Sequence, residues 1–387
     1  MDISETIHLL GDLLGEVIIE QESRDLFDLE ERVRALAKAR RSDDPEVSAE
    51  AESALWREIS GLDLRSAWVI ACAFALYFDL VNTAEDNARM SLIREEALSK
   101  SPEPVHDSID EALKLLKANG LTQAQMADLL SNLHMELVLT AHPTEARRRT
   151  VLSKIARIAQ TLRALSSEPL LPREIEEYQA ELRNEITTLW LTDRSRSSQP
   201  TPTDEVRTAL YFVGQVFWTA LPMLDERLQE GLAKYYPGLS IHHPWLKLAS
   251  WMGGDRDGNP NVTAEVTAET LTLHRGLAIE NHRAAMQDLS RRLSMSVEHR
   301  PLPDDLRAWL SRRPVLPPHA ARIQSRYPNE PYRLILALMA NELAEASQDD
   351  MKTRLLSSAP HAARINLQDL SVPLEAIRQV IPSAIAR

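Results

Sequence analysis

The chain has 387 residues, of which 44% are hydrophobic, enough to bury a substantial core in more than one lobe. Its 57 acidic and 44 basic residues give a formal net charge of −13, which excludes a general nucleic-acid binder and means that an anion must be bound by a local basic site. The single cysteine, Cys72, excludes an internal disulfide framework and a cysteine-based zinc cluster and predicts a reducing, cytoplasmic location.

The amino-terminal region carries no membrane or export signal that we recognise. Its first residues, MDISETIHLLGDLLGEVI, have acidic side chains where a signal peptide needs basic ones. The longest apolar stretch, Ala67 to Phe78, is too short to span a bilayer, so we predict a buried helix and no membrane partner.

Helices are predicted along most of the chain. Glycine numbers only 11, and apolar side chains recur every three to four residues, for example from Val151 to Leu165 in a helix predicted over 145–165. Proline-rich and polar connections separate further helices, and we find no fixed-period repeat. These helices are predicted near 5–20, 47–60, 65–97, 107–131, 173–192, 204–234, 264–295 and 331–346.

Two short apolar runs are predicted to be strands: ELVLT at 136–140 and WLKLASWM from Trp245 to Met252. Each leads through a polar loop into a predicted helix. Because the first backbone N–H groups of a helix face a ligand, this repeated arrangement predicts one shared site.

The first of these loops contains His142. Pro143 holds His142 in extended geometry, Thr144 can cap the next helix, and Glu145 suits the first turn of that helix. A histidine here could move a proton near neutral pH, and at least one of the arginines at 147–149 could reach a phosphate or carboxylate. From these residues alone, a structural histidine beside solvated arginines remains an equal alternative.

The second loop, SWMGGDRDGNPNVT at 250–263, is dense in polar side chains. Asp255, Arg256, Asp257 and Asn259 lie among three glycines, and Thr263 is a predicted helix cap. The alternative to a binding loop is an ion-paired turn whose Asp and Arg side chains cap backbone groups.

Other site types find little support in the sequence. Asp255 and Asp257 do not begin an EF-hand, because Pro260 and Val266 stand where that loop needs Gly and Glu. There is no P-loop, GxGxxG, HExxH or GxSxG motif. His134 and His274 are predicted to lie on helix surfaces.

A third polar segment, from Leu189 to Val213, carries Asp193, Arg194 and Arg196 between two predicted helices. By itself it predicts a helical hairpin with a charged tip.

These stretches together resemble the phosphoenolpyruvate carboxylase family. TAHPTEARRRT is similar to the family's first signature, and SWMGGDRDGNPNVT is nearly its second long motif. Further similar stretches are LLGDLLGEVIIEQE, residues 73–89, Trp190 to Glu205, and PYRLILALMANEL at 331–343. The resemblance covers nearly the whole chain, and it favours a functional role for His142.

The resemblance implies carboxylation of phosphoenolpyruvate by bicarbonate, giving oxaloacetate and phosphate through carboxyphosphate and the enolate of pyruvate. This anaplerotic carbon dioxide fixation feeds the tricarboxylic acid cycle and uses Mg²⁺ or Mn²⁺. By similarity, His142 is the base that deprotonates carboxyphosphate. Arg147 and Arg256 would bind substrate, and the supporting residues would be Thr144, Glu145, Asp255, Asp257 and Asn259.

The family fold implies a mainly α chain, in which a helical bundle surrounds the first strands of a (β/α)-barrel that stays incomplete. We therefore predict three regions: an amino-terminal helical region at 1–135, the first strands with both loops and the hairpin at 136–265, and a helical region at 266–387. The resemblance also implies a homo-oligomer, usually a tetramer, or a complementary carboxy-terminal chain.

The resemblance stops short of a whole enzyme. Family members are more than twice as long, and their later half carries the metal ligands and a glycine-rich loop, whereas Gly276 is the only glycine after Gly258 here. We expect an amino-terminal portion that is inactive alone. The alternatives are a non-catalytic regulatory or assembly subunit, or a complete enzyme with a metal site built from Asp255, Asp257 or Glu145. Ser197 and Gln199 stand where the family has more basic residues, which weakens the hairpin as an anion site.

Overall fold

The computed structural model describes residues 2–140, 148–167, 169–194, 200–357 and 365–381, and over these residues the chain is mainly helical, as predicted. It divides into two compact units, each assembled from segments that are distant in sequence. The first comprises Met1–Asp128, Pro143–Gln199 and Arg227–Ser240, and the second comprises Leu129–His142, Pro200–Glu226 and Ile241–Arg387. The three regions predicted at 1–135, 136–265 and 266–387 stay a prediction.

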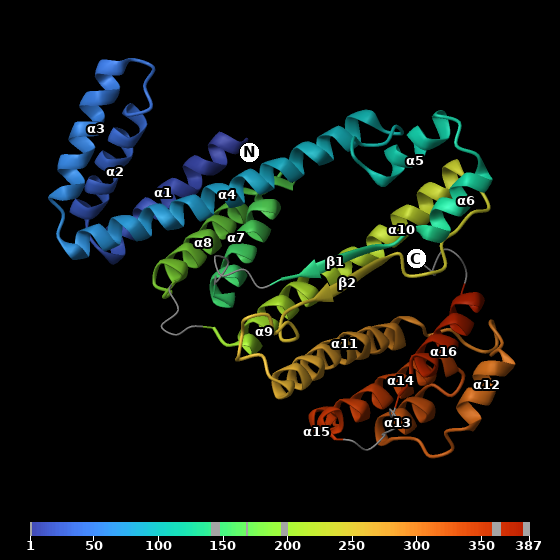
Figure 1. Cartoon of the computed structure of the whole chain (residues 1–387). Coiled ribbons are helices and arrows are strands. Elements are labelled where there is room, and N and C mark those ends of the chain that lie inside the picture. The colour runs from blue at the N-terminus through green and yellow to red at the C-terminus, as the bar shows by residue number, and fades with distance from the viewer. Residues whose placement is uncertain (1, 141–147, 168, 195–199, 358–364, 382–387) are drawn as a thin grey trace. The chain divides into compact units, whose positions relative to one another are not determined.

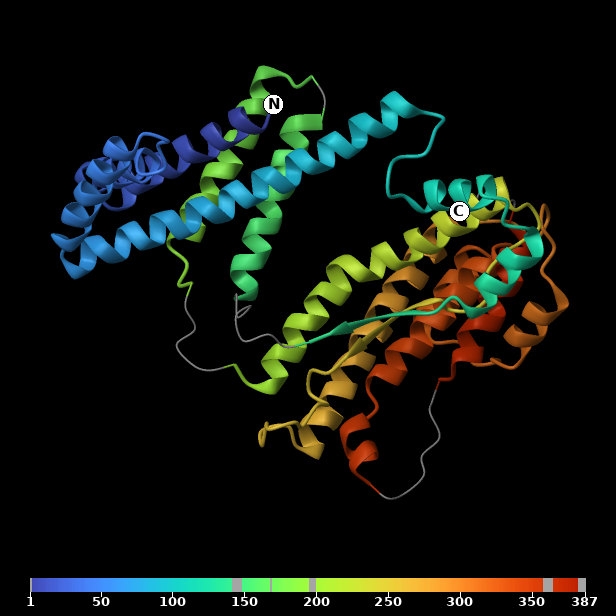
Figure 2. The ribbon, with the colours of Figure 1, turned by 45° about the horizontal axis from the view of Figure 1, so that its top comes forward.

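Four helices form the core of the first unit (Figures 1 and 2): α1 (Ile3–Gln21), α4 (Leu64–Lys100), α7 (Arg149–Ser167) and α8 (Pro172–Trp190). α1 begins with a reciprocal capping box, in which Asp2 and Glu5 each accept a backbone N–H of the other. The apolar stripes of these helices meet in one cluster, because burying them removes the largest apolar area from water. Fully buried members include Leu76, Leu80, Leu162, Leu182, Ile186 and Leu189.

The helix α4 contains Ala67 to Phe78, the apolar stretch that was judged too short to span a bilayer. It has 37 residues, so by length and composition alone it could cross a membrane, a test that core helices of soluble proteins also pass. One of its faces packs in the cluster through Ala73, Leu76 and Leu80, while Trp68 and Phe78 are exposed. The stretch is helical, as predicted, but it is buried on one face only rather than throughout, and the argument from length was wrong.

The helices α2 (Arg24–Ala39) and α3 (Pro45–Ser60) form a hairpin beside the first turns of α4. Leu29, Val33 and Leu55 pack with Ile70 in a small separate cluster. Glu30 is 7% exposed at this position, and burial, reinforced by the charge of Glu31, raises the pKa of its carboxyl to about 7.

Glu30→Gln is therefore expected to stabilise the protein at alkaline pH. Above pH 7 the folded wild type must ionise a carboxyl whose folded pKa of about 7 lies above its ordinary value of 4.5, a cost of roughly 2–3 kcal/mol that the neutral amide avoids. The gain should shrink as the pH falls from 7 towards 4.5, where the unfolded chain also binds the proton. Urea unfolding at pH 8 and pH 5 measures it. Glu52→Gln, at an exposed position of α3, is the control, and a gain that is equal at both pH values would contradict the assignment.

Residues 107–131, predicted as one helix, form two: α5 (Ile109–Ala118) and α6 (Gln123–Asn132). Between them Gly120 has φ of +84°, a left-handed conformation that ends a helix and favours glycine. The helix predicted at 204–234 is likewise interrupted. It comprises α9 (Pro202–Phe212), a π-helical turn at Val213–Phe217, and α10 (Trp218–Tyr235).

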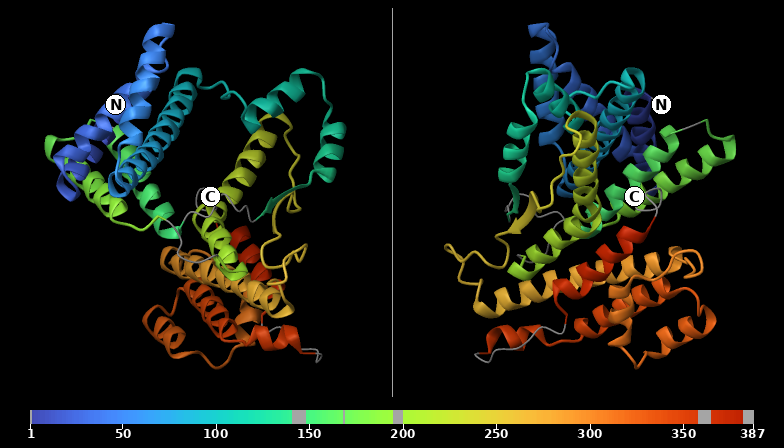
Figure 3. Two further views of the ribbon diagram at one scale, coloured as in Figure 1. Left: turned by 60° about the vertical axis from the view of Figure 1, so that its left-hand side comes forward. Right: turned by 90° about the vertical axis from the view of Figure 1, so that its right-hand side faces the viewer.

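In the second unit, α11 (Ala264–Arg292) packs along α14 (Pro331–Ser347), as Figure 3 shows. α14 is buried around nearly its whole circumference, which its apolar sequence YRLILALMANEL requires. Shorter helices cover the pair and contribute Leu306, Trp309 and Ile377 to the cluster. They are α12 (Asp304–Ser311), α13 (Pro318–Arg326), α15 (Met351–Leu356) and α16 (Leu367–Val380).

The two predicted strands are confirmed as β1 (Met135–Leu139) and β2 (Leu246–Ser250). They pair in parallel, with Met135 opposite Leu246 and Leu139 opposite Ser250. Parallel strands are normally covered on both faces, yet Met135 and Val138 of β1 are exposed.

Candidate functional site

The site is positioned by the carboxyl ends of β1 and β2, which meet at one edge because the strands are parallel. The Trp251 N–H donates to the Leu139 carbonyl at 3.0 Å, so this pairing continues one residue beyond β2. Thr140 then leaves β1 towards the segment that contains His142, and the loop 251–263 leaves β2 at the same edge. In α/β folds, polar groups at this edge are placed to contact a ligand.

The loop 251–263 is a series of hydrogen-bonded turns. The N–H groups of Gly254 and Asp255 both donate to the Trp251 carbonyl, at 3.0 and 2.9 Å. The Asp255 carboxylate accepts the Asp257 N–H at 3.1 Å, and the Asn259 side chain accepts the Asn261 N–H at 3.0 Å. Asp255 and Asn259 therefore fix the loop backbone through Asx turns.

Arg256 holds this loop against the start of α11. Its Nε donates to the Val262 carbonyl at 3.2 Å, and its Nη2 donates to the Thr267 hydroxyl at 3.3 Å. Thr263 caps the helix by accepting the Val266 N–H at 3.4 Å, as the sequence predicted. The Arg256 side chain is exposed, so its guanidinium also faces solvent.

Gly253 allows a close approach between this loop and α11. Its φ is +71°, and a Cβ atom built on it would lie 2.0 Å from Thr270 Oγ1. Gly258 also has a positive φ, +66°, but a Cβ there would meet open space. Of these two glycines, Gly253 therefore has both a conformational and a steric requirement.

A cavity of about 320 Å³ lies beside this loop, and small-molecule sites have volumes of roughly 300–1,000 Å³. Its walls are the ends of both strands, Gly253 and Gly254, one face of α11, and Val213 of the π-helical turn. His274 lies on that face, and burial lowers the pKa of its imidazole, so the ring is neutral at pH 7.

The placement of His274 corrects the sequence prediction. The side chain is half-buried in the cavity wall, and His134 is exposed in the coil before β1 rather than on a helix. The helical spacing of Thr267, Thr270 and His274 could have indicated their common face. That this face lines a cavity depends on packing that spacing does not specify.

His142, Thr144, Glu145 and Arg147, predicted as site residues, lie outside the described residues. Their neighbour Arg148 is described: its Nη1 donates to the Asp193 carbonyl at 2.5 Å and lies 3.9 Å from the Asp193 carboxylate. This contact joins the basic block of the first loop to the third polar segment within the first unit.

In the third polar segment, the described charged side chains, Asp193 and Arg194, form ion pairs. Arg194 binds the buried carboxylate of Asp79 on α4. Arg194 and Asp193 thus hold the end of α8 to neighbouring elements of the first unit. Their observed contacts favour a structural role for these two residues, and Arg196 lies outside the described residues.

The residues at the loop do not fit a metal ion well. Among the described residues, a group of three side chains close enough to hold a cation comprises His106, Asp107 and Glu111, in the first unit. Asp255 and Asp257 are exposed, and one Asp255 oxygen already accepts a backbone N–H. A hard cation such as Mg²⁺ needs more oxygen ligands than these two residues place together.

Comparison with known proteins identifies the family. The family model described as phosphoenolpyruvate carboxylase matches residues 3–384. Proteins named phosphoenolpyruvate carboxylase are similar to this chain, with 37% identity in Roseiflexus castenholzii over 86% of the chain, and 39% in Rhodothermus marinus over 76% of it. One from Xanthomonas euvesicatoria is 32% identical over 97% of the chain.

The same comparisons measure how much of each relative is represented. The chain spans 35%, 31% and 41% of the length of those three relatives, or about a third. The family match extends over both loops and over both compact units. This chain therefore belongs to the phosphoenolpyruvate carboxylase family.

Proposed function

We propose that this chain supplies the amino-terminal part of a phosphoenolpyruvate carboxylase, which joins bicarbonate to phosphoenolpyruvate and gives oxaloacetate and phosphate. The observation that carries the proposal is the loop 251–263, built at the carboxyl edge of β1 and β2 beside a cavity of about 320 Å³. In the sequence, the segment with His142 directly follows β1. Family membership supplies the substrates.

In the proposed reaction, a bicarbonate oxygen attacks the phosphorus of phosphoenolpyruvate, and the bond from phosphorus to the enol oxygen breaks. The products of this step are carboxyphosphate and the enolate of pyruvate. His142 then removes the proton of carboxyphosphate, which breaks into carbon dioxide and phosphate, and the enolate carbon attacks the carbon dioxide. We assign Arg147 to substrate oxygens, together with Nη1 of Arg256. Thr144, Glu145, Asp255, Asp257 and Asn259 are assigned to shaping the two loops. The observed Asx turns support this for Asp255 and Asn259.

We assign no metal ligand to this chain. Mg²⁺ or Mn²⁺, when bound in a carboxylase, would stabilise charge that develops on the enolate oxygen. The carboxylates of the loop 251–263 are used in turns or lie exposed, so the ligands are proposed to come from other residues of the working enzyme.

The exposed apolar side chains of β1 support a further element of the proposal. Met135, Leu137 and Val138 are exposed on a strand whose parallel pairing favours cover on both faces. We propose that additional parallel strands complete a (β/α)-barrel around β1 and β2 in a cytoplasmic homo-oligomer or with a complementary carboxy-terminal chain.

Oxaloacetate formation from phosphoenolpyruvate, bicarbonate and Mg²⁺ tests the proposal. The chain is assayed alone and after mixing with the carboxy-terminal part of the Rhodothermus marinus relative, with association of the two checked by sedimentation. Activity in the mixture alone is the expected result. Association without activity would favour a non-catalytic assembly subunit, and full activity of the chain alone would contradict the assignment of groups to another part of the enzyme.

A further inference from the structure

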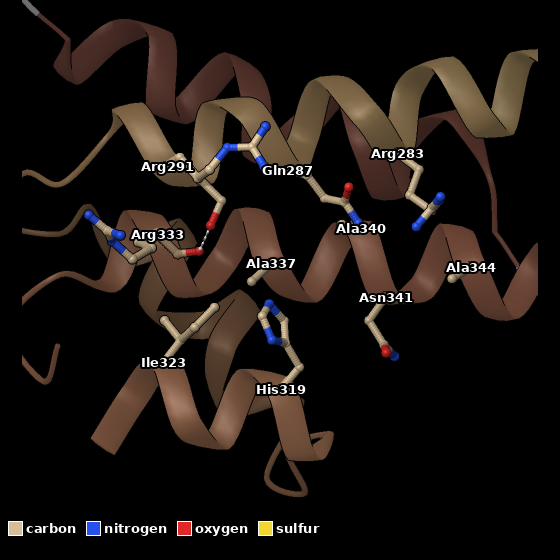
Figure 4. A pocket seen from close by; sticks show the side chains of 11 residues that line it. Arg283, Gln287, Arg291, His319, Ile323, Arg333, Ala337, Ala340, Asn341 and Ala344 are labelled. Atoms are coloured by element: carbon tan, nitrogen blue, oxygen red, sulfur yellow. Dashed lines mark hydrogen bonds between the residues drawn. The ribbon is translucent and has the colours of Figure 1, made fainter. Parts of the chain in front are cut away.

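A second cavity, in the second unit, has an unusual electrostatic setting. Residues 283–333 carry ten arginines and five carboxylates, so this segment is basic although the whole chain has a net charge of −13. The cavity of about 460 Å³ lies within the structure formed by this segment and α14. Figure 4 shows the polar side chains that surround it: Arg283, Gln287 and Arg291 from α11, His319 from α13, and Arg333 and Asn341 from α14.

The described lining contains three guanidinium groups, one imidazole and two carboxamides, and no lining residue is acidic. Ala337, Ala340 and Ala344 of α14 form a floor of small side chains, which leaves the space between the cationic groups open. A concave site with several polar groups around an apolar floor is typical of small-molecule binding. Guanidinium groups in particular match phosphate and carboxylate oxygens in pairs.

The acidic partners of these arginines lie outside the lining. Glu280 accepts two hydrogen bonds from Arg283, at 3.1 and 2.6 Å, whereas Arg333 and Arg291 are each bound from one side. Arg333 Nε donates to Glu330 at 2.7 Å, and its guanidinium lies 4.4 Å from the Tyr327 ring centre, so this arginine is held in place. Arg291 is 72% exposed and lies 3.5 Å from Asp288, whose other oxygen pairs with Arg292 at 2.7 Å. Exposed pairs three residues apart stabilise a helix by only about 0.2–0.5 kcal/mol, so Arg291 can turn to a ligand.

We propose that this cavity binds a multiply charged small anion, a phosphate or polycarboxylate metabolite, between α11, α13 and α14. Arg291 and Arg333 hold the anion from two helices, and His319 and Asn341 supply further donors. Nucleic acid and anionic membranes do not fit a concave site of this volume on a chain with a net charge of −13. The site is independent of the proposed carboxylation.

Calorimetric titration of the purified chain with pyrophosphate, and separately with citrate, tests this site at fixed ionic strength. Arg291→Gln is expected to weaken binding about tenfold, because one charge-assisted hydrogen-bonding group is lost. Arg307→Gln is the matched control: it removes an exposed arginine that is 3.6 Å from Asp304 and lies outside the cavity, and it should change affinity less than about twofold.

The two titrations distinguish the class of anion that the cavity binds. Binding of pyrophosphate alone assigns the site to phosphate compounds, and binding of citrate alone assigns it to polycarboxylates, provided that Arg291→Gln weakens it. Absence of binding by the wild type at millimolar concentrations overturns the proposal. Equal weakening by Arg291→Gln and Arg307→Gln also overturns it, because it would show a response to net charge alone. Circular dichroism checks that both variants keep their helix content.

Discussion

Replacing His142 with asparagine is expected to lower oxaloacetate formation by the reconstituted enzyme at least a hundredfold, and up to about ten-thousandfold. Asparagine keeps a polar side chain next to Pro143 but cannot accept a proton near neutral pH. If carboxyphosphate loses its proton to His142, the variant should retain binding of phosphoenolpyruvate while the rate falls. Steady-state assays of kcat and KM separate these two effects.

His134→Asn is the matched control, because His134 is exposed in the coil before β1 and has no assigned role. It should leave kcat within about twofold. Association of the two parts should be unchanged in both variants. A wild-type kcat in His142→Asn would contradict the role of His142 as the base. It would leave the proposed carboxylase activity of the mixture standing.

The helices and strands were predictable where the apolar pattern was local. The stripe from Val151 to Leu165 lies within α7, and both short apolar runs form strands, because period and run length determine which face can be buried. The strand, loop and capped helix over 246–292 were also predicted in the right order. Here glycines, Asx side chains and Thr263 each favour the same local conformation.

Other helices were not predicted, because their sequences contain prolines or many charged residues that hide the helical pattern. α13 begins within a proline-rich stretch that predicted a connection, yet Pro318 occupies its first turn, where proline costs no hydrogen bond. α16 contains Pro373, a residue that usually interrupts a helix. α2 carries many charges, and its apolar residues become informative only once they pack against Leu55 and Ile70.

The cavities depend on contacts between distant segments and were not predictable. Apolar spacing continues through 204–234, but the π-helical turn at Val213–Phe217 changes which side chains face the cavity beside the loop. The basic segment 283–333 was visible in the sequence, whereas the placement of Arg291, His319 and Arg333 around one cavity required α11, α13 and α14 to pack together.

Gly253→Ala is expected to destabilise the second unit by about 3–4 kcal/mol. Left-handed backbone costs an alanine roughly 1–2 kcal/mol, and overpacking a close contact adds about 1–3 kcal/mol. At Gly253 both apply, since φ is +71° and the new Cβ would lie 2.0 Å from Thr270 Oγ1. Thr270 cannot move freely, because it is 4% exposed and its hydroxyl donates to the Val266 carbonyl at 2.8 Å.

Gly258→Ala separates the two causes, because its φ of +66° carries the backbone cost while a Cβ there meets open space. It should therefore cost only about 1–2 kcal/mol in urea unfolding. The double variant Gly253→Ala with Thr270→Ala should recover part of the larger loss, since removing Oγ1 and Cγ2 relieves the contact. Equal costs for the two glycine variants would mean that the loop moves away from α11 without penalty. In that case Arg256 would have to hold the loop, through Val262 and Thr267, without help from this close contact.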